Sequence, residues 1–281
     1  MFSSRSKSKK NLHVLLSSTI PTISAPLDLI VEKLYDFYFL QEAAEIKFSL
    51  RLIGTGNRDS STLLVMEAGK TLNGVLFKKP HHFVEPKISR RASDLGLGPY
   101  VFYSDTDLII EEWFDSSRSW RNLAEINNLP PPRQFAKEVL NKYYTMLVHK
   151  TVHAFDSLPN HLFVLEFDGI DFRWIDWGKP KYLDAPAATS HWRTADHFSA
   201  LIEILAPLQN GPMYYCALVS EIKTMVDVER RIFFEGILAQ VRRDLENPNS
   251  FSYSRNILAP KWVSFFNNAD TLLDFDNLHS Y

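Results

Sequence analysis

The stretch "IKFSLRLIGTGNRDSSTLLVMEAGKTLNGVLFKKP", residues 46–80, decides how the N-terminal part of this chain folds. Its runs of aliphatic and aromatic residues are broken by Gly, Asn, Asp and Ser, a pattern typical of strands joined by turns. We expect three strands, at about 46–53, 61–67 and 73–79. Gly54 and Gly56 lie between the first two, where a Gly-rich turn lets backbone amides approach phosphate oxygens. A plain hairpin turn is the alternative, and the lack of a following helix argues against dinucleotide-binding and Walker-type loops.

The flanking segments add helices and two more strands to this part of the chain. Residues 25–46 carry apolar residues at helical spacing and predict a helix before the first strand. Residues 83–99, "FVEPKISRRASDLGLGP", predict a short helix that ends in a Gly-rich stop. The runs "YVFYS" and "DLIIEEWF", within residues 100–114, predict two further strands.

The C-terminal part is expected to be mainly helical from "SSRSWRNLAEI", residues 116–126, onward. Residues 131–150 begin with Pro and repeat apolar residues on one face, which predicts an amphipathic helix. Two short apolar runs around Asp168-Gly169 predict a hairpin.

The fold class expected from this order is α+β, with a small β-rich part and a larger helical part. Residues 1–24 are expected to be a flexible basic tail, residues 25–114 the β-rich part, and residues 115–281 the helical part. Ligands favour clefts between two such parts.

Bulk composition limits the classes of partner. Of 281 residues, 45% are hydrophobic and 23% charged, and the formal net charge is −2, so no nucleic acid partner is expected. No apolar run approaches the ~18 residues that a transmembrane segment needs.

The single cysteine, Cys216, lies among apolar residues and predicts a buried thiol, which suits a reducing, cytoplasmic compartment. The basic, Ser-rich residues at the start leave a secretion signal or a contact with an anionic surface as the alternative to a solvated arm.

Lys78 and Glu85 are the first candidates for chemistry. Lys78 ends the third predicted strand after three apolar residues, and a lysine there can neutralise phosphate charge. A solvated lysine at a strand end is the alternative. Glu85 opens the following helix, where its carboxylate can pair with Lys78. Alternatively, it is only a carboxylate at a helix start, where the helix dipole stabilises it.

Asp176 and the loop "VHAFDSLPNHLF", residues 152–163, are the second group. Asp176 follows an apolar strand, and a carboxylate at a strand end is a suitable ligand for Mg²⁺. In the loop, Asp156 can orient or accept the proton of an attacking hydroxyl, and Asn160 can offer a second oxygen to the metal. A solvated surface loop is the alternative reading of the pattern.

The order of these pieces resembles the protein-kinase-like superfamily over roughly residues 45 to 205. Residues 88–114 look like the stretch before the hinge in choline-kinase-like and aminoglycoside-phosphotransferase-like members. "RTADHFSALIEIL", residues 193–205, is similar to the protein-kinase helix whose Asp supports the catalytic loop, and Asp196 would fill that place.

The resemblance implies a two-lobed protein-kinase-like fold with ATP and Mg²⁺ as cofactors. It assigns nucleotide binding to Gly54, Gly56, Lys78, Glu85, Glu111, Glu112, Trp113 and Phe114. The two glycines would cover the phosphates, and the last four residues would form the hinge whose backbone bonds adenine. It assigns catalysis to His153 and Asp156, the metal to Asn160 and Asp176, and structural support to Asp196.

One departure from the family concerns the catalytic loop. His153 and Asn160 keep the family's spacing of seven, but Phe155 stands where the family has its Asp, and the acid comes one residue later at Asp156. Loss of a positioned base typically costs ~10²–10⁴ in rate. The expected function is therefore an ATP- and Mg²⁺-dependent phosphotransferase acting on a small-molecule or protein hydroxyl. The alternatives are an impaired pseudokinase that binds nucleotide or protein, and an unrelated α+β protein.

Overall fold

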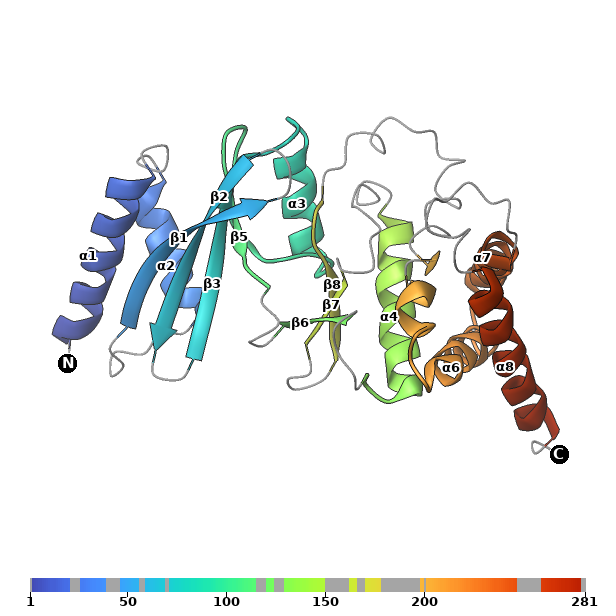
Figure 1. The fold of residues 1–281 in the computed structure, drawn as a ribbon. Helices are drawn as coiled ribbons and strands as arrows, with labels where there is room; N and C mark the ends of the chain where they lie inside the picture. The colour runs from blue at the N-terminus through green and yellow to red at the C-terminus, as the bar shows by residue number, and fades with distance from the viewer. Residues whose placement is uncertain are drawn as a thin grey trace. The chain divides into compact units, whose positions relative to one another are not determined.

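The protein is described here from a computed structural model. It describes residues 2–20, 26–38, 46–55, 59–68, 71–114, 120–123, 129–149, 162–165, 170–177, 198–199, 201–246 and 259–278. The chain divides into two compact units, residues 1–120 and residues 121–281. This division falls close to the boundary expected after residue 114. Figure 1 labels the elements of both units.

The first unit is built on a five-stranded antiparallel sheet in the order β1-β2-β3-β5-β4. Its strands are β1 (Ile46–Thr55), β2 (Asp59–Ala68), β3 (Thr71–Lys78), β4 (Val101–Ser104) and β5 (Ile109–Glu112). Each predicted strand is confirmed to within a few residues. Gly54 lies inside β1 and pairs with Ser60, one step before the last pair of the β1–β2 ladder, so the expectation that it lies between the two strands is wrong.

Two N-terminal helices cover one face of this sheet. These are α1 (Phe2–Thr19) and α2 (Leu27–Tyr38), which lie side by side in Figure 1. Their buried side chains form one hydrophobic core with alternate residues of the strands, including Phe77 of β3 and Ile110 of β5. The opposite face of the sheet carries the intervening residues, and the helix α3 (Glu85–Asp94) follows β3.

The expectation of a flexible tail over residues 1–24 is wrong for residues 2–19. Leu12 and Leu16 of α1 are fully buried, and Ile20 follows them in the same core. These residues recur every four positions, so they lie on one face of a helix and can pack together against α2. Lys9 and Glu32 add an ion pair between the two helices.

The second unit combines helices with a three-stranded sheet in the order β6-β7-β8. The sheet consists of β6 (Trp120–Asn122), β7 (Leu162–Leu165) and β8 (Asp171–Trp174). The helices are α4 (Pro132–Val148), α6 (Gly211–Lys223), α7 (Val228–Glu246) and α8 (Ala259–Leu278). The predicted hairpin is confirmed, because Leu162 pairs with Trp174 and Leu165 with Asp171 in an antiparallel register.

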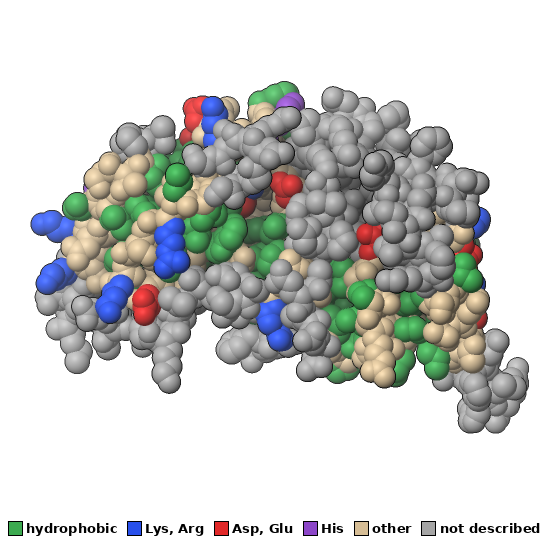
Figure 2. Space-filling model, in the orientation of Figure 1, with side chains coloured by type: hydrophobic (Ala, Val, Ile, Leu, Met, Phe, Trp, Pro, Cys, Tyr) green, Lys and Arg blue, Asp and Glu red, His purple; other side chains and the backbone are tan. Residues whose placement is uncertain are grey.

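The strand β6 corrects the expectation that the chain is helical over residues 116–126. Trp120 and Asn122 are buried while Arg121 between them is partly exposed, which is the alternation of a strand. The fold is thus of mixed α and β class, with an antiparallel five-stranded sheet and an antiparallel β7–β8 pair, which is consistent with the class α+β. Among the described residues, no helix is both long and apolar enough to cross a bilayer. Figure 2 shows Lys and Arg side chains at separate places on one face of the molecule, among hydrophobic side chains.

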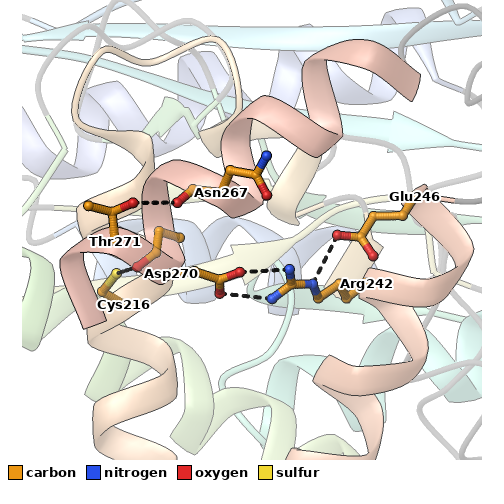
Figure 3. A network of polar contacts seen from close by, with 7 residues as sticks. Cys216, Arg242, Glu246, Asn267, Asp270 and Thr271 are labelled. Atoms are coloured by element: carbon orange, nitrogen blue, oxygen red, sulfur yellow. Dashed lines mark hydrogen bonds and ion pairs between the residues drawn. The ribbon is translucent and has the colours of Figure 1, made fainter. Parts of the chain in front are cut away.

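A polar network joins three helices of the second unit (Figure 3). Arg242 of α7 donates two hydrogen bonds of 2.8 Å to the carboxylate of Asp270 on α8, and a third of 3.0 Å to Glu246. The bonds to Asp270, more than the one to Glu246, raise the pKa of the Arg242 guanidinium. Cys216 of α6 is buried, as expected, and its Sγ lies 3.3 Å from the backbone oxygen of Ala269.

Candidate functional site

Lys78 is held by two buried carboxylates in the first unit. Its Nζ lies 2.8 Å from Oε1 of Glu111 and 3.3 Å from Oε1 of Glu85. The side chains of Lys78, Glu85 and Glu111 are only 12%, 2% and 7% exposed. The ion pair between Lys78 and Glu85 expected from the resemblance is therefore present, and a second carboxylate joins it.

The sheet and the helix α3 bring these three groups together. Lys78 pairs with Ile109 and Leu76 pairs with Glu111 in the β3–β5 ladder. Residues two apart on a strand share a face, so Lys78 and Glu111 are diagonal neighbours on the same side of the sheet. Glu85 reaches them from the first turn of α3.

Glu85 is fixed at the start of α3 by more than its contact with Lys78. Its Oε2 accepts a 2.7 Å hydrogen bond from the backbone N–H of His81, and a carboxylate in the first turn interacts favourably with the helix dipole. Its Oε1 is buried and accepts no hydrogen bond. The 3.3 Å approach of the Lys78 ammonium to that oxygen is therefore an electrostatic contact without hydrogen-bond geometry.

Apolar side chains surround the three charges on this face of the sheet. Leu63 pairs with Leu76 across β2 and β3, and both are less than a tenth exposed, while Ile109 is fully buried. Water is excluded from such surroundings, and charges there interact more strongly than at the surface. The two carboxylates of Glu85 and Glu111 are therefore held firmly against Lys78.

The predicted hinge, residues 111–114, has much of its backbone occupied by the sheet. The N–H of Glu112 donates to the oxygen of Tyr100 at 2.8 Å, and that of Trp113 donates to the oxygen of Gly74 at 2.9 Å. Phe114 is buried and stacks on Trp120, with ring centroids 4.5 Å apart. Two of the N–H groups expected to bond adenine thus already have acceptors.

Asp176 lies directly after the β7–β8 hairpin, as predicted. Its side chain is exposed, and its φ of 65° is in the left-handed region that non-glycine residues seldom adopt. The next residue is anchored, because Trp177 is 2% exposed and its Nε1 donates a 2.7 Å hydrogen bond to the oxygen of Trp174. The fixed indole holds the chain in the turn that presents the Asp176 carboxylate.

The remaining predicted site residues lie outside the described residues. They are Gly56, His153, Asp156, Asn160 and Asp196. Within the parts of the chain that the structure describes, no group of three or more His, Cys, Asp or Glu side chains is arranged to hold a metal ion. Of the two predicted metal ligands, Asp176 lies among the described residues.

Sequence reasoning missed the side-chain role of Glu111. It treated residues 111–114 as a backbone hinge, although a signal for more was present. In "DLIIEEWF" the strand alternation places Ile109 and Glu111 on one face and Ile110 and Glu112 on the other. Only the register between β3 and β5, in which Leu76 pairs with Glu111, then places the Glu111 carboxylate on the face of Lys78.

Comparisons with known proteins give little further information. No protein-family model matches the chain, and no curated protein matches it. A similar solved structure is the complex of Neurospora crassa PAN2 (WD40-CS1) with PAN3 (pseudokinase and C-term), at 15% sequence identity and a TM-score of 0.33. The match covers 83% of this chain and 66% of that chain, so this chain spans just under two thirds of the other's length.

Proposed function

We propose that this protein is an ATP- and Mg²⁺-dependent phosphotransferase with a two-lobed protein-kinase-like fold, which transfers phosphate to a small-molecule or protein hydroxyl. The observation that carries the proposal is the buried ion pair of Lys78 and Glu85, 3.3 Å apart, on one face of an antiparallel sheet. A buried lysine oriented by a carboxylate is a means of neutralising phosphate charge. An isolated buried ammonium would be costly without such a partner.

The backbone of Asp176 supports the same proposal. A non-glycine residue at φ 65° costs free energy, and such residues cluster at active sites and ligand clamps. An exposed carboxylate held in that conformation suits a hard cation such as Mg²⁺. We assign Asp176 to the metal and Lys78 to the phosphates of the nucleotide, which when bound supplies the phosphoryl group.

A second function is favoured by two specific observations. Phe155 occupies the place of the family's catalytic Asp, and the N–H groups of Glu112 and Trp113 are bonded within the sheet. Both features suit a catalytically impaired pseudokinase that acts as a nucleotide- or protein-binding module.

Thermal unfolding with and without ATP and Mg²⁺ tests nucleotide binding. Ligand at about 100 times its dissociation constant should add ~2.7 kcal/mol, a rise of a few degrees in the unfolding temperature. Lys78→Met and Asp176→Ala should abolish the rise. The matched controls are Lys79→Met, the exposed neighbour of Lys78, and Asp107→Ala, an exposed aspartate, and both should keep it. If millimolar ATP does not raise the unfolding temperature of wild-type protein, with or without Mg²⁺, the protein is neither the proposed phosphotransferase nor a nucleotide-binding pseudokinase.

Turnover separates the two candidate functions. A phosphotransferase should convert ATP to ADP as the γ-phosphoryl group passes to an added hydroxyl compound or, more slowly, to water, in a reaction followed by ³¹P NMR. Asp156→Ala should lower that rate by ~10²–10⁴ without weakening binding. Binding that depends on Lys78 and Asp176, without any release of ADP, would favour the binding module.

A further inference from the structure

We propose that the outer edge of β1 binds an extended segment of another protein, in which acidic residues alternate with apolar ones, as an added strand of the first unit's sheet. The proposal does not depend on the proposed function, because it uses residues 46–53, none of which was assigned to the nucleotide or the metal. Of the strands that the structure describes, only β2 pairs with β1. An edge strand directs alternate backbone N–H and C=O groups away from the sheet, where a further strand can bond to them.

The two edges of this sheet are built differently. β4 forms the other edge, and side chains of two helices bond to its backbone. Ser93 of α3 accepts a 3.0 Å hydrogen bond from the N–H of Val101, and the Lys33 ammonium of α2 donates one of 3.0 Å to the backbone oxygen of Phe102. β4 also has only four residues, whereas β1 has ten. β1 is therefore the edge that offers a long row of backbone groups to a partner.

One face of β1 is apolar and incompletely covered. Ile46, Phe48 and Leu50 are partly buried against the hydrophobic core of the first unit. Leu52 lies on the same face, because residues two apart on a strand share a face, yet its side chain is 75% exposed. An apolar side chain of an added strand beside Leu52 would remove that surface from water. The added strand therefore needs apolar residues at alternate positions.

The other face of β1 is basic. Lys47, Ser49 and Arg51 alternate with the apolar residues, and all three side chains are exposed. Residues that lie opposite one another on neighbouring strands have Cβ atoms about 5 Å apart, so opposite charges attract there and like charges repel. An added strand with Asp or Glu opposite Lys47 and Arg51 would pair with both cations. These positions alternate with its apolar residues, which defines the chemistry of the partner.

The same two cations argue against a second copy of this chain as the partner. With Leu50 opposite its own copy in an antiparallel pair, Arg51 would lie diagonally beside Lys47 of the other copy. Shifting the strands by one pair of residues would place Lys47 opposite Arg51 in one direction, and Arg51 opposite itself in the other. Like charges on an edge strand oppose self-association, whereas an acidic segment meets no such repulsion.

The test measures the fluorescence anisotropy of a labelled, end-capped peptide, VEVEVEVE, with the full chain at 0.15 M salt. The wild-type chain should bind it more tightly than VVEEVVEE, which has the same composition without the alternation. Lys47→Glu with Arg51→Glu should weaken binding of VEVEVEVE by about tenfold or more and strengthen binding of VKVKVKVK, because two attractive pairs become repulsive. Lys87→Glu with Lys137→Glu is the matched control, since both lysines are exposed on helices, and it should leave the affinity unchanged.

Hydrogen exchange locates the bound peptide. Amides of residues 46–55 should exchange more slowly with VEVEVEVE present, while those of β4 should not change. Equal binding of the two acidic peptides, protection only away from β1, or unchanged affinity after the charge reversal would overturn the proposal. So would an absence of binding at millimolar peptide, which would mean that Lys47 and Arg51 only prevent self-association.

Sedimentation velocity of the wild-type chain tests the other partner. A dimer with protected β1 amides would make a second copy the partner and overturn the proposal, whereas a monomer agrees with it. Circular dichroism checks the fold of each variant. If the charge-reversed variant unfolds, Lys47→Gln with Arg51→Gln replaces it, and this variant should also weaken binding of VEVEVEVE.

Discussion

Arg242 and Asp270 join the helices α7 and α8 through two parallel hydrogen bonds of 2.8 Å each. A bidentate guanidinium–carboxylate pair is stronger and more specific in geometry than a single ionic contact. The Arg242 guanidinium also lies over the Phe266 ring, 5.1 Å from its centroid. Its side chain is 32% exposed and that of Asp270 is 43% exposed, so water screens part of the attraction.

Arg242→Ala should therefore lower the free energy of unfolding by about 1–2 kcal/mol, through the lost hydrogen bonds and the lost packing on Phe266. Arg243→Ala is the matched control, since Arg243 is the exposed next residue on α7 and donates a 2.9 Å hydrogen bond to Gln240 of the same helix. Urea unfolding at pH 7 measures both variants. Equal stability of the two would show that the bidentate pair contributes little.

The start of α6 admits no side chain at Gly211. A Cβ added there would lie 2.0 Å from the backbone oxygen of Leu205. Gly→Ala in an unstrained position stabilises by about 0.4–1 kcal/mol, but here the clash should reverse the sign and cost about 3 kcal/mol. Met213→Ala, at a 52% exposed position two residues later, should change stability by less than about 0.5 kcal/mol. A stabilised Gly211→Ala protein would contradict the packing described for α6.

The β4–β5 turn is held by the carboxylate of Asp105. Its Oδ1 accepts the N–H groups of Asp107 and Leu108, each at 2.8 Å, and its Oδ2 accepts the hydroxyl of Tyr103 at 2.7 Å. Burial tends to raise the pKa of Asp105, but these three hydrogen bonds together hold it below its usual value. The hydrogen bond that the Tyr103 hydroxyl donates to Asp105 also raises the pKa of that hydroxyl.

A lowered carboxyl pKa means that Asp105 stabilises the fold above its unfolded pKa of about 3.9 and ceases to do so as the pH falls through the folded value. NMR titration of the side chain should find the folded pKa of Asp105 below that unfolded value. Asp105→Ala should cost about 1 kcal/mol at pH 7, while Asp107→Ala, at an exposed position, should cost less. A normal titration of Asp105 would rule out the turn described.

The packing of α1 can be tested with one buried and one exposed residue. Leu16 is fully buried and Val14 is 57% exposed on the same helix. Leu16→Ala should lower the free energy of unfolding by about 2–4 kcal/mol, whereas Val14→Ala should change it by less than about 0.5 kcal/mol. Chemical denaturation measures both variants. If Leu16→Ala leaves the free energy of unfolding unchanged, residues 2–19 do not pack against the first unit as described.

The sheet of the first unit could be predicted from sequence because its strands are marked locally. Alternating apolar residues mark β1, β2 and β3, and turn residues mark their ends. Antiparallel strands joined by short turns pair with their neighbours along the chain, so their pairing can be predicted from local sequence. The helix α4 was likewise marked by Pro at its start and by a repeating apolar face. The ion pair of Lys78 and Glu85 was expected because the resemblance carried both residues.

The features that were missed depend on partners elsewhere in the chain. The strand β6 has three residues, too few for a local pattern, and it exists because it pairs in the β6-β7-β8 sheet. The helix α1 is rich in Ser and Lys, and only Leu12, Leu16 and Ile20 show that it has a face to bury. The role of Glu111 required the register between β3 and β5, which no stretch of either strand contains by itself.

The burial of Cys216 makes it a chemical reporter of local opening. It is the single cysteine of the chain, 7% exposed, and its Sγ lies 3.3 Å from the Ala269 oxygen of α8. A disulfide reagent such as Ellman's can modify the thiol only when α6 and α8 separate, so the rate of modification at high reagent concentration equals the rate of that opening. The modification rate of this native thiol therefore measures, without any added label, how fast α6 and α8 of the second unit separate.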